Sequence, residues 1–360
     1  MGFTLHTVVC ERLGCRYPIV QTGMGWVATP ELVAAVGNAG AFGFLGAATL
    51  RPDEIDAEIA RVRKLSDRPF GVSFLMDAPG APEIADAVLR HGVRAVGYNR
   101  APDPKLIGRF KAAGVLCVPT CGALRHARKA EALGADLIIV QGSEGGGHTG
   151  AVPSSLLISQ VADGVEVPVI AAGGFRDGRG LVAALAFGAA GVAMGTRFLL
   201  TRESPVPEPT RARYLRAAVD DVFVTRAVDG LPQRVVRNEL VSRLESSTAV
   251  VRLLRALRSA LAFRRESGAS VGELLRAALR LRQHERLTRS QILMAANAPI
   301  LARRAMREGD PVRGYLPGGS VAGVIEDLPS CRELVERIVG EAERTLAALA
   351  GSGGPDVDRL

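Results

Sequence analysis

The sequence predicts an α/β protein, a (β/α)8 TIM barrel joined to a smaller, mostly helical inserted domain. Through the first two hundred residues, short apolar runs alternate with amphipathic stretches at a spacing of about 25 residues. Each run is short, bounded by Gly or Pro and apolar on both faces, which is typical of parallel strands covered by helices. Eight such units favour a closed barrel over an open doubly wound sheet.

The eight expected strands follow one another in regular order. They are residues 17–23, 41–47, 69–75, 93–99, 115–120, 136–142, 167–174 and 190–198. Helical patterns separate them, and the first has Thr29 at the N-cap and Pro30 at the first helical position. In the second pattern, Ile55, Ile59 and Val62 recur at helical spacing. The glycines of "GNAG" (37–40) follow a helix, not the first strand, so they indicate a C-cap turn and not a dinucleotide motif.

After Leu200 the βα rhythm stops at a proline-rich connector. We expect residues 1–205 to form the barrel, 206–312 a helical inserted domain, 313–350 the return to the barrel and 351–360 a flexible tail. The return includes a closing helix whose start, Ser330 with Glu333 three residues later, matches a capping box.

Composition indicates a cytoplasmic protein. No uncharged apolar run reaches the roughly 18 residues that a membrane span needs, and the N-terminus lacks a signal-peptide pattern. The chain has five cysteines, an odd number that argues for reduced thiols. Cys117 and Cys121 have C-x3-C spacing, for which ordinary strand-end thiols are favoured over a redox or zinc role. We therefore expect no metal site.

The net charge of +8 is unevenly distributed. Residues 252–307 contain thirteen Arg, no Lys and three Glu, so this segment carries +10. Such a segment either faces an anionic partner or forms a solvated helix face. Nucleic acid is disfavoured, because Phe263 is the one aromatic residue there.

The glycines that end the last two barrel strands predict a phosphate site. Active sites of such barrels form at the C-terminal strand ends, and phosphate commonly binds after strands seven and eight. Gly173 and Gly174 end one strand, and Gly195 with Thr196 ends the next. Their backbone N–H groups and the threonine hydroxyl suit an anion. The structural alternative is that small residues let the barrel close.

The stretch "VQGSEGGGHTG" (140–150) places His148 behind a glycine-rich loop at a strand end. A histidine can take up or release a proton near neutral pH, so we expect His148 to be catalytic. The other histidines suit surface roles. They are His6, His91, His126 and His284.

This stretch, "PIVQTGMG" (18–25) and "VIAAGGFRDGRGLVAALAFGAAGVAMGTRFL" (169–199) together resemble the nitronate monooxygenase family, formerly called 2-nitropropane dioxygenases. Flavin-dependent type II enoyl-acyl-carrier-protein reductases share its superfamily. The resemblance runs from about residue 8 to residue 345 and implies FMN bound in a TIM barrel, with His148 as the proton-transfer group. It places Gly23, Met24 and Gln141 near the flavin ring, and Gly146, Gly147, Gly173, Gly174, Gly195 and Thr196 around the ribityl phosphate.

"VQTGMGWVA", "QILMAANAP" and "DLPSCRELVERIV" look like a narrower actinobacterial group. That group includes a flavin oxidoreductase of steroid-ring catabolism that acts on bicyclic CoA thioesters. Two positions depart from plain nitronate monooxygenases: Ser73 replaces an Asn beside the cofactor, and Gly319-Ser320 replaces a Gly-Gln pair. The residues expected to face the substrate are Trp26, Ser320, Arg264 and Arg265.

Three functions follow. The first is an FMN-dependent oxidoreductase that moves hydride between flavin and an enone- or acyl-CoA-type substrate, with His148 as acid or base. Arginines of the basic segment would bind the CoA phosphates. The second is a nitronate monooxygenase that uses O2, and the third is a non-catalytic phosphate- or nucleotide-binding module. NADH or NADPH as electron donor and a homodimer are left open.

Overall fold

The computed structural model describes residues 5–78, 80–99, 102–247 and 297–351. Within these ranges, eight parallel strands close into a barrel in which the first strand pairs with the last. Every one overlaps a predicted apolar run, which confirms the predicted (β/α)8 barrel. The last run, 190–198, is a strand only in its first part, because the chain becomes helical at Thr196. The barrel strands are β1 (Ile19–Gln21), β2 (Phe42–Gly46), β3 (Gly71–Ser73), β4 (Ala95–Tyr98), β5 (Leu116–Cys121), β6 (Ile138–Gln141), β8 (Val169–Ala172) and β9 (Gly191–Met194).

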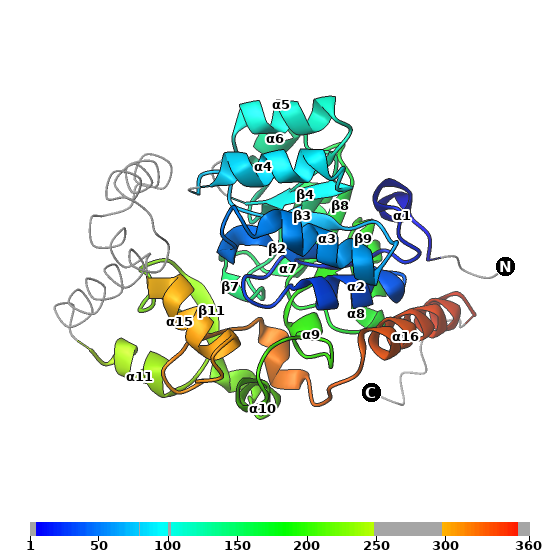
Figure 1. The fold of residues 1–360 in the computed structure, drawn as a ribbon. Coiled ribbons are helices and arrows are strands. Elements are labelled where there is room, and N and C mark those ends of the chain that lie inside the picture. The colour runs from blue at the N-terminus through cyan, green and yellow to red at the C-terminus, as the bar shows by residue number, and fades with distance from the viewer. Residues whose placement is uncertain (1–4, 79, 100–101, 248–296, 352–360) are drawn as a thin grey trace.

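Helices surround this barrel (Figure 1). In the second of them, Ile55, Ile59 and Val62 are all buried, so the predicted helical stripe is confirmed. The covering helices are α2 (Pro30–Asn38), α3 (Ile55–Leu65), α4 (Ala81–Arg90), α5 (Pro104–Ala112), α6 (Leu124–Ala132), α7 (Ser154–Ala162), α8 (Gly178–Ala186) and α16 (Cys331–Gly351), with the short η1 (Ala47–Thr49) and α9 (Thr196–Leu199) between them. No helix within the described ranges is both long and apolar enough to cross a membrane.

The two ends of the barrel are covered differently. At one end, α1 (Val8–Leu13) packs its buried Val9 and Leu13 against strand residues such as Val20 and Phe42. The described segments between β9 and α16 gather away from α1, around the other end (Figure 1). The bottom of the barrel is therefore closed by apolar side chains, and the C-terminal strand ends meet the later part of the chain.

That later part contains a small sheet that the sequence patterns did not predict. Strands β10, β11 and β12 are antiparallel neighbours, and β11 also pairs with β7, which lies in the loop after β6. Helices precede and follow the hairpin, so residues 206–312 hold strands as well as helices. The elements are β7 (Gly147–His148), α10 (Glu208–Leu215), η2 (Val219–Asp221), β10 (Val222–Thr225), β11 (Gln233–Val236), α11 (Glu239–Glu245), α15 (Asn297–Met306), β12 (Leu316–Pro317) and η3 (Ser320–Val324).

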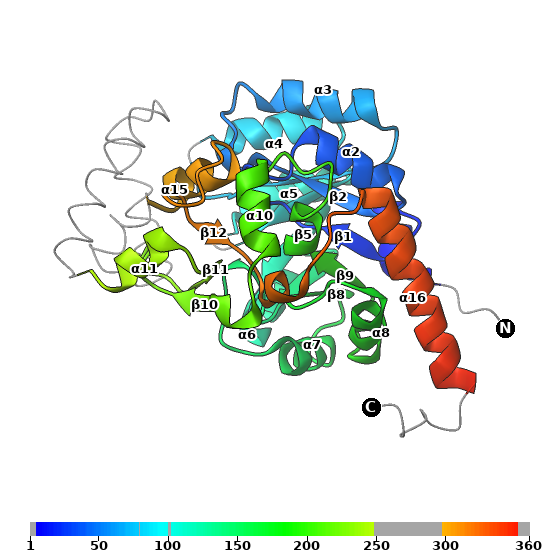
Figure 2. The same cartoon turned by 90° about the horizontal axis from the view of Figure 1, so that it is seen from below.

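The closing helix α16 returns the chain to the barrel and packs on α8 and α2 (Figure 2). Its predicted capping box is confirmed. The backbone N–H of Ser330 donates to the Glu333 carboxylate at 2.8 Å, and the N–H of Glu333 donates to Ser330 Oγ at 3.2 Å. This reciprocal pair satisfies donors that a helix start otherwise leaves unpaired.

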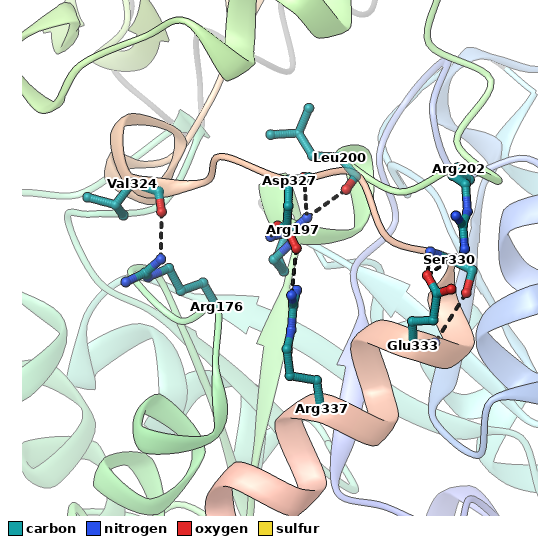
Figure 3. A network of polar contacts seen from close by, with 9 residues as sticks. All are labelled: Arg176, Arg197, Leu200, Arg202, Val324, Asp327, Ser330, Glu333 and Arg337. Carbon is teal, nitrogen blue, oxygen red and sulfur yellow. Dashed lines mark hydrogen bonds and ion pairs between the residues drawn. The ribbon is translucent and has the colours of Figure 1, made fainter.

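A buried arginine ties the return segment to the barrel (Figure 3). Arg197, in α9, is 4% exposed, and its Nη1 donates to Asp327 Oδ1 at 2.7 Å. Its Nη2 donates to the carbonyl oxygens of Leu200 and Asp327. Arg337, from α16, contacts the second Asp327 oxygen at 2.5 Å. Asp327 thus joins α9 to α16, and its partner Arg197 directly follows the predicted phosphate residue Thr196 in the chain.

We expect Asp327→Asn to lower the free energy of unfolding at neutral pH by about 1 kcal/mol. This is below the roughly 1.5–3 kcal/mol of hydrogen bonds to charged groups, because the Asp327 side chain is 43% exposed and solvent screens its charge. Partial burial opposes ionisation, but Arg337 and Arg197 outweigh it, so the pKa of the Asp327 carboxyl lies below its ordinary value of 3.8. A lowered folded-state pKa means that this stabilisation is present at neutral pH and is lost as pH falls through the folded pKa.

Denaturant titrations from pH 7 to pH 3 test this expectation. The difference in the free energy of unfolding between wild type and Asp327→Asn should become smaller in acid. Asp53→Asn is the control, because Asp53 is 72% exposed and its pair with Arg51 should contribute little. A difference that stays constant down to pH 3 would contradict the assignment.

Candidate active site

Residues predicted to border the flavin meet where β1, β3 and β9 end. A Cβ atom on Gly23 would lie 2.2 Å from Ser73 Cβ, so a side chain at position 23 would displace the end of β3. A Cβ atom on Gly195 would lie 3.4 Å from Met24 Sδ. The structure therefore brings Gly23, Met24, Ser73 and Gly195 together at one end of the barrel.

The predicted phosphate site has the backbone form that an anion requires. Gly173 and Gly174 have φ of +92° and +85°, in the left-handed region that favours glycine. Within the described ranges, the backbone N–H groups of Gly174, Gly195 and Thr196 donate no hydrogen bond. Unpaired N–H groups at the ends of neighbouring strands fit a phosphate. The residues present therefore fit the ribityl phosphate of a flavin mononucleotide.

The return segment lies against the same strand ends. The N–H of Gly319 donates to Thr196 Oγ1 at 2.9 Å, and the N–H of Ser320 donates to the carbonyl of Glu144 at 2.9 Å. A Cβ atom on Gly146 would lie 2.6 Å from Gly319 N, so this close approach requires glycine. Ser320, predicted from the far end of the chain, is thus brought beside the glycine-rich loop.

His148 is held at the C-terminal end of the barrel, called the mouth below, by its backbone and by its ring. In β7 it lies opposite Gln233 of β11, and Gln141 Nε2 donates to its carbonyl at 2.9 Å. Its side chain is 45% exposed, and Nε2 is 2.8 Å from Oδ2 of the buried Asp229. Among the described residues Nδ1 has no partner. An imidazole held in this way can exchange a proton with a ligand.

Asp229 is a candidate that the sequence analysis missed. It lies in the connection between β10 and β11, and its neighbour Gly230 has φ of +85°. An Asp-Gly pair in such a place indicates only a turn. No local signal could have linked it to a histidine 81 residues earlier.

Trp26, expected to face the substrate, adopts φ of +65°, which is uncommon for a residue other than glycine. Its backbone N–H donates to Thr49 Oγ1 at 3.1 Å, and the Arg307 guanidinium lies 5.7 Å from its ring centroid. Trp26 therefore joins the loop after β1 to the chain that follows α15. Arg264 and Arg265 lie outside the described residues.

The cysteines of the C-x3-C spacing are buried in the barrel wall. Burial raises the pKa of the Cys117 thiol and of the Cys121 thiol to about 12. Both therefore stay protonated at neutral pH and are poor nucleophiles. Within the described ranges, no group of three or more His, Cys, Asp or Glu side chains could hold a metal ion.

The class is that of a (β/α)8 barrel whose last two strands end, among the described residues, in unpaired N–H groups that could bind an anion, with a histidine close by. Comparison with known proteins then gives the family. The nitronate monooxygenase family model matches residues 6–100 and 85–341, and the chain belongs to this family of oxidoreductases.

Two relatives share most of the chain. One, from Mycobacterium tuberculosis (strain ATCC 25618 / H37Rv), is 50% identical over 341 residues, which are 94% of this chain and 96% of that protein. The other, from Rhodococcus jostii (strain RHA1), is 46% identical over 346 residues, 96% of this chain and 98% of that protein. Both are named (3aS,4S,5R,7aS)-5-hydroxy-7a-methyl-1-oxo-octahydro-1H-indene-4-carboxyl-CoA dehydrogenase.

A solved structure, FabK from Thermotoga maritima, is similar in fold and sequence. It superposes with a TM-score of 0.78 at 32% identity, and the match covers 97% of this chain and 99% of that one. The likeness therefore extends through the small sheet and the closing helix as well as the barrel.

Proposed function

We propose that this protein is an FMN-dependent oxidoreductase that transfers hydride between the flavin and an enone- or acyl-CoA-type substrate. The observation that carries the proposal is the arrangement at the mouth, where the exposed ring of His148 shares one end of the barrel with the glycine ends of β8 and β9. The His148 ring would exchange a proton, and the backbone N–H groups at the glycine ends would hold an anion.

FMN fits the residues at the strand ends. The N–H groups of Gly174, Gly195 and Thr196 would bind its phosphate, and Gly146 and Gly147 would line the same region. Gly23, Met24, Ser73 and Gln141 would border the ring. Bound flavin would supply the hydride chemistry, while the protein positions the substrate and moves the proton.

A CoA thioester is the substrate class that the relatives support. Both close relatives are named for a bicyclic carboxyl-CoA, and each is matched over nearly its whole length. The basic segment 252–307 carries the charge that CoA phosphates attract, and its Arg264 and Arg265 are our proposed contacts. Trp26 and Ser320 would face the acyl part at the mouth.

Oxidation of alkyl nitronates with O2 is the second candidate, and the family match supports it. The shorter side chains of Ser73 and Ser320 favour the first candidate. They remove two amides that would otherwise reach toward flavin or substrate, and so leave room for a bulkier molecule.

Anaerobic flavin reduction tests the proposal. The purified protein should contain non-covalent FMN and not FAD, and its absorbance near 450 nm should bleach with a bicyclic hydroxyacyl-CoA but not with an alkyl nitronate. NADH and NADPH are added in parallel to identify an electron donor. Bleaching by nitronate alone would establish the second candidate, and a protein that cannot be reconstituted with FMN would overturn both.

A further inference from the structure

The imidazole of His148 contacts a carboxylate from a distant part of the chain. Asp229 Oδ2 is 2.8 Å from His148 Nε2, and the two residues are 81 positions apart. The Asp229 side chain is 3% exposed, whereas that of His148 is 45% exposed. One nitrogen of the ring therefore faces the protein interior and the other is left for a ligand.

Asp229 is itself fixed by donors of its own hairpin. Gln233 Nε2 donates to its Oδ2 at 2.5 Å, and the N–H of Leu231 donates to its Oδ1 at 3.0 Å. Both oxygens of the Asp229 carboxylate act as hydrogen-bond acceptors. Its contact with His148 therefore needs a donor on the histidine, which places the hydrogen on His148 Nε2. The Asp229 carboxylate is therefore held at both oxygens, although Gln233 Oε1, on the donating amide, is buried without a hydrogen-bond partner among the described residues.

The strand pairing makes the contact geometrically specific. His148 and Gln233 are directly opposite in the β7–β11 ladder, which puts their side chains on the same face of the small sheet. Gln141 holds the histidine backbone from the barrel side through its 2.9 Å hydrogen bond. The ring is thus located by the barrel and by the inserted hairpin together.

We propose that Asp229 is a positioning residue, which holds the His148 imidazole as its Nε2–H tautomer and leaves Nδ1 to exchange the substrate proton. The inference rests on the proposed function, since it assigns the atom through which His148 acts. A carboxylate on one imidazole nitrogen fixes the tautomer and the ring orientation, and sets what the other nitrogen can do. The hairpin of the inserted domain therefore completes the acid–base group of the barrel.

The first measurement is spectroscopic and does not depend on turnover. Two-bond ¹H–¹⁵N correlation spectra of the holoprotein, with ¹⁵N-labelled histidine, report the tautomer, and His148→Gln identifies the His148 signals. We expect Nε2–H in the wild type and a mixture of tautomers in Asp229→Asn and Asp229→Ala. A wild-type Nδ1–H form, or a tautomer that both substitutions leave unchanged, would overturn the proposal even if no substrate were yet known.

The second measurement is kinetic. Asp229→Asn is nearly isosteric and should lower kcat roughly 10- to 100-fold, the loss typical of removing a histidine's outer partner in metal sites. KM and the FMN dissociation constant should stay within about twofold, because Asp229 lies behind the ring. The exposed Asp220, on η2 just before β10, gives the control Asp220→Asn, with wild-type values.

The two measurements are read together. A changed tautomer with a lowered kcat supports the positioning role. An unchanged kcat overturns it, and so does a loss of FMN together with activity, which would mean that Asp229 only maintains the fold. Failure of the proposed function is a separate result, because it would appear in the wild type as absent turnover while the tautomer remains measurable.

Discussion

Replacing His148 with glutamine should lower turnover about 10²- to 10⁴-fold, the usual contribution of a general acid or base, while FMN stays bound. Glutamine can still donate to Asp229, so the buried carboxylate keeps a partner and the hairpin keeps its place. It cannot take up a proton near neutral pH. Steady-state kinetics with the substrate found in the anaerobic panel, together with the flavin content of the purified variant, measure the two effects separately.

His6→Gln is the matched control, because His6 is exposed and lies before α1 at the other end of the barrel. It should behave as the wild type. Near-normal turnover by His148→Gln would remove His148 from the mechanism. Loss of flavin along with activity would instead assign it a structural role.

Alanine at Gly173 should raise the FMN dissociation constant at least about tenfold, which is 1.4 kcal/mol. The backbone there has φ of +92°, where a residue with a Cβ atom is strained by roughly 1–2 kcal/mol. The new Cβ would also lie 2.9 Å from Ser154 Oγ and 3.0 Å from the carbonyl oxygen of Gly142. Relief of this crowding would turn the Gly174 N–H away from the phosphate. Fluorescence titration of the apoprotein with FMN measures the change.

Gly114→Ala supplies the control for backbone strain. Gly114 has φ of +72°, and a Cβ atom there would meet nothing within 4 Å. It follows α5, away from the predicted cofactor residues, so its substitution should lower stability by a similar amount and leave FMN affinity unchanged. If the two variants bind FMN equally well, the glycine ends of the strands are not the phosphate site.

The barrel was predictable because each strand carries its own signal. Runs such as 136–142 are apolar on both faces and end at glycine, and the helices between them keep a helical stripe. The small sheet carries no such signal. Strands β7 and β12 are two residues long. They pair with β11 along the edge opposite β10, and one comes far before β11 in the sequence and the other far after it. Short strands of this kind are defined by tertiary contacts and not by local pattern.

The candidate site was predictable where it follows the barrel rule that function collects at C-terminal strand ends. This rule led to Gly173, Gly195 and His148, and the resemblance added Ser73 and Ser320. It could not lead to Asp229, because the contact depends on the β7–β11 register. The roles of these residues remain predictions until the variants are measured.

The position of α16 in the chain has a consequence for synthesis on the ribosome. The last barrel strand ends at Met194, but the helix that packs on α2 and α8 begins only at Cys331. At about 5–20 residues per second, a nascent chain would wait on the order of 10 to 30 s between making that strand and finishing the helix. Through that interval the apolar surface later covered by Leu334, Val335 and Ile338 stays open to water and to other nascent chains. A ribosome that stops early would release a barrel lacking its final cover, which gives chaperones and proteases a means of recognising incomplete copies.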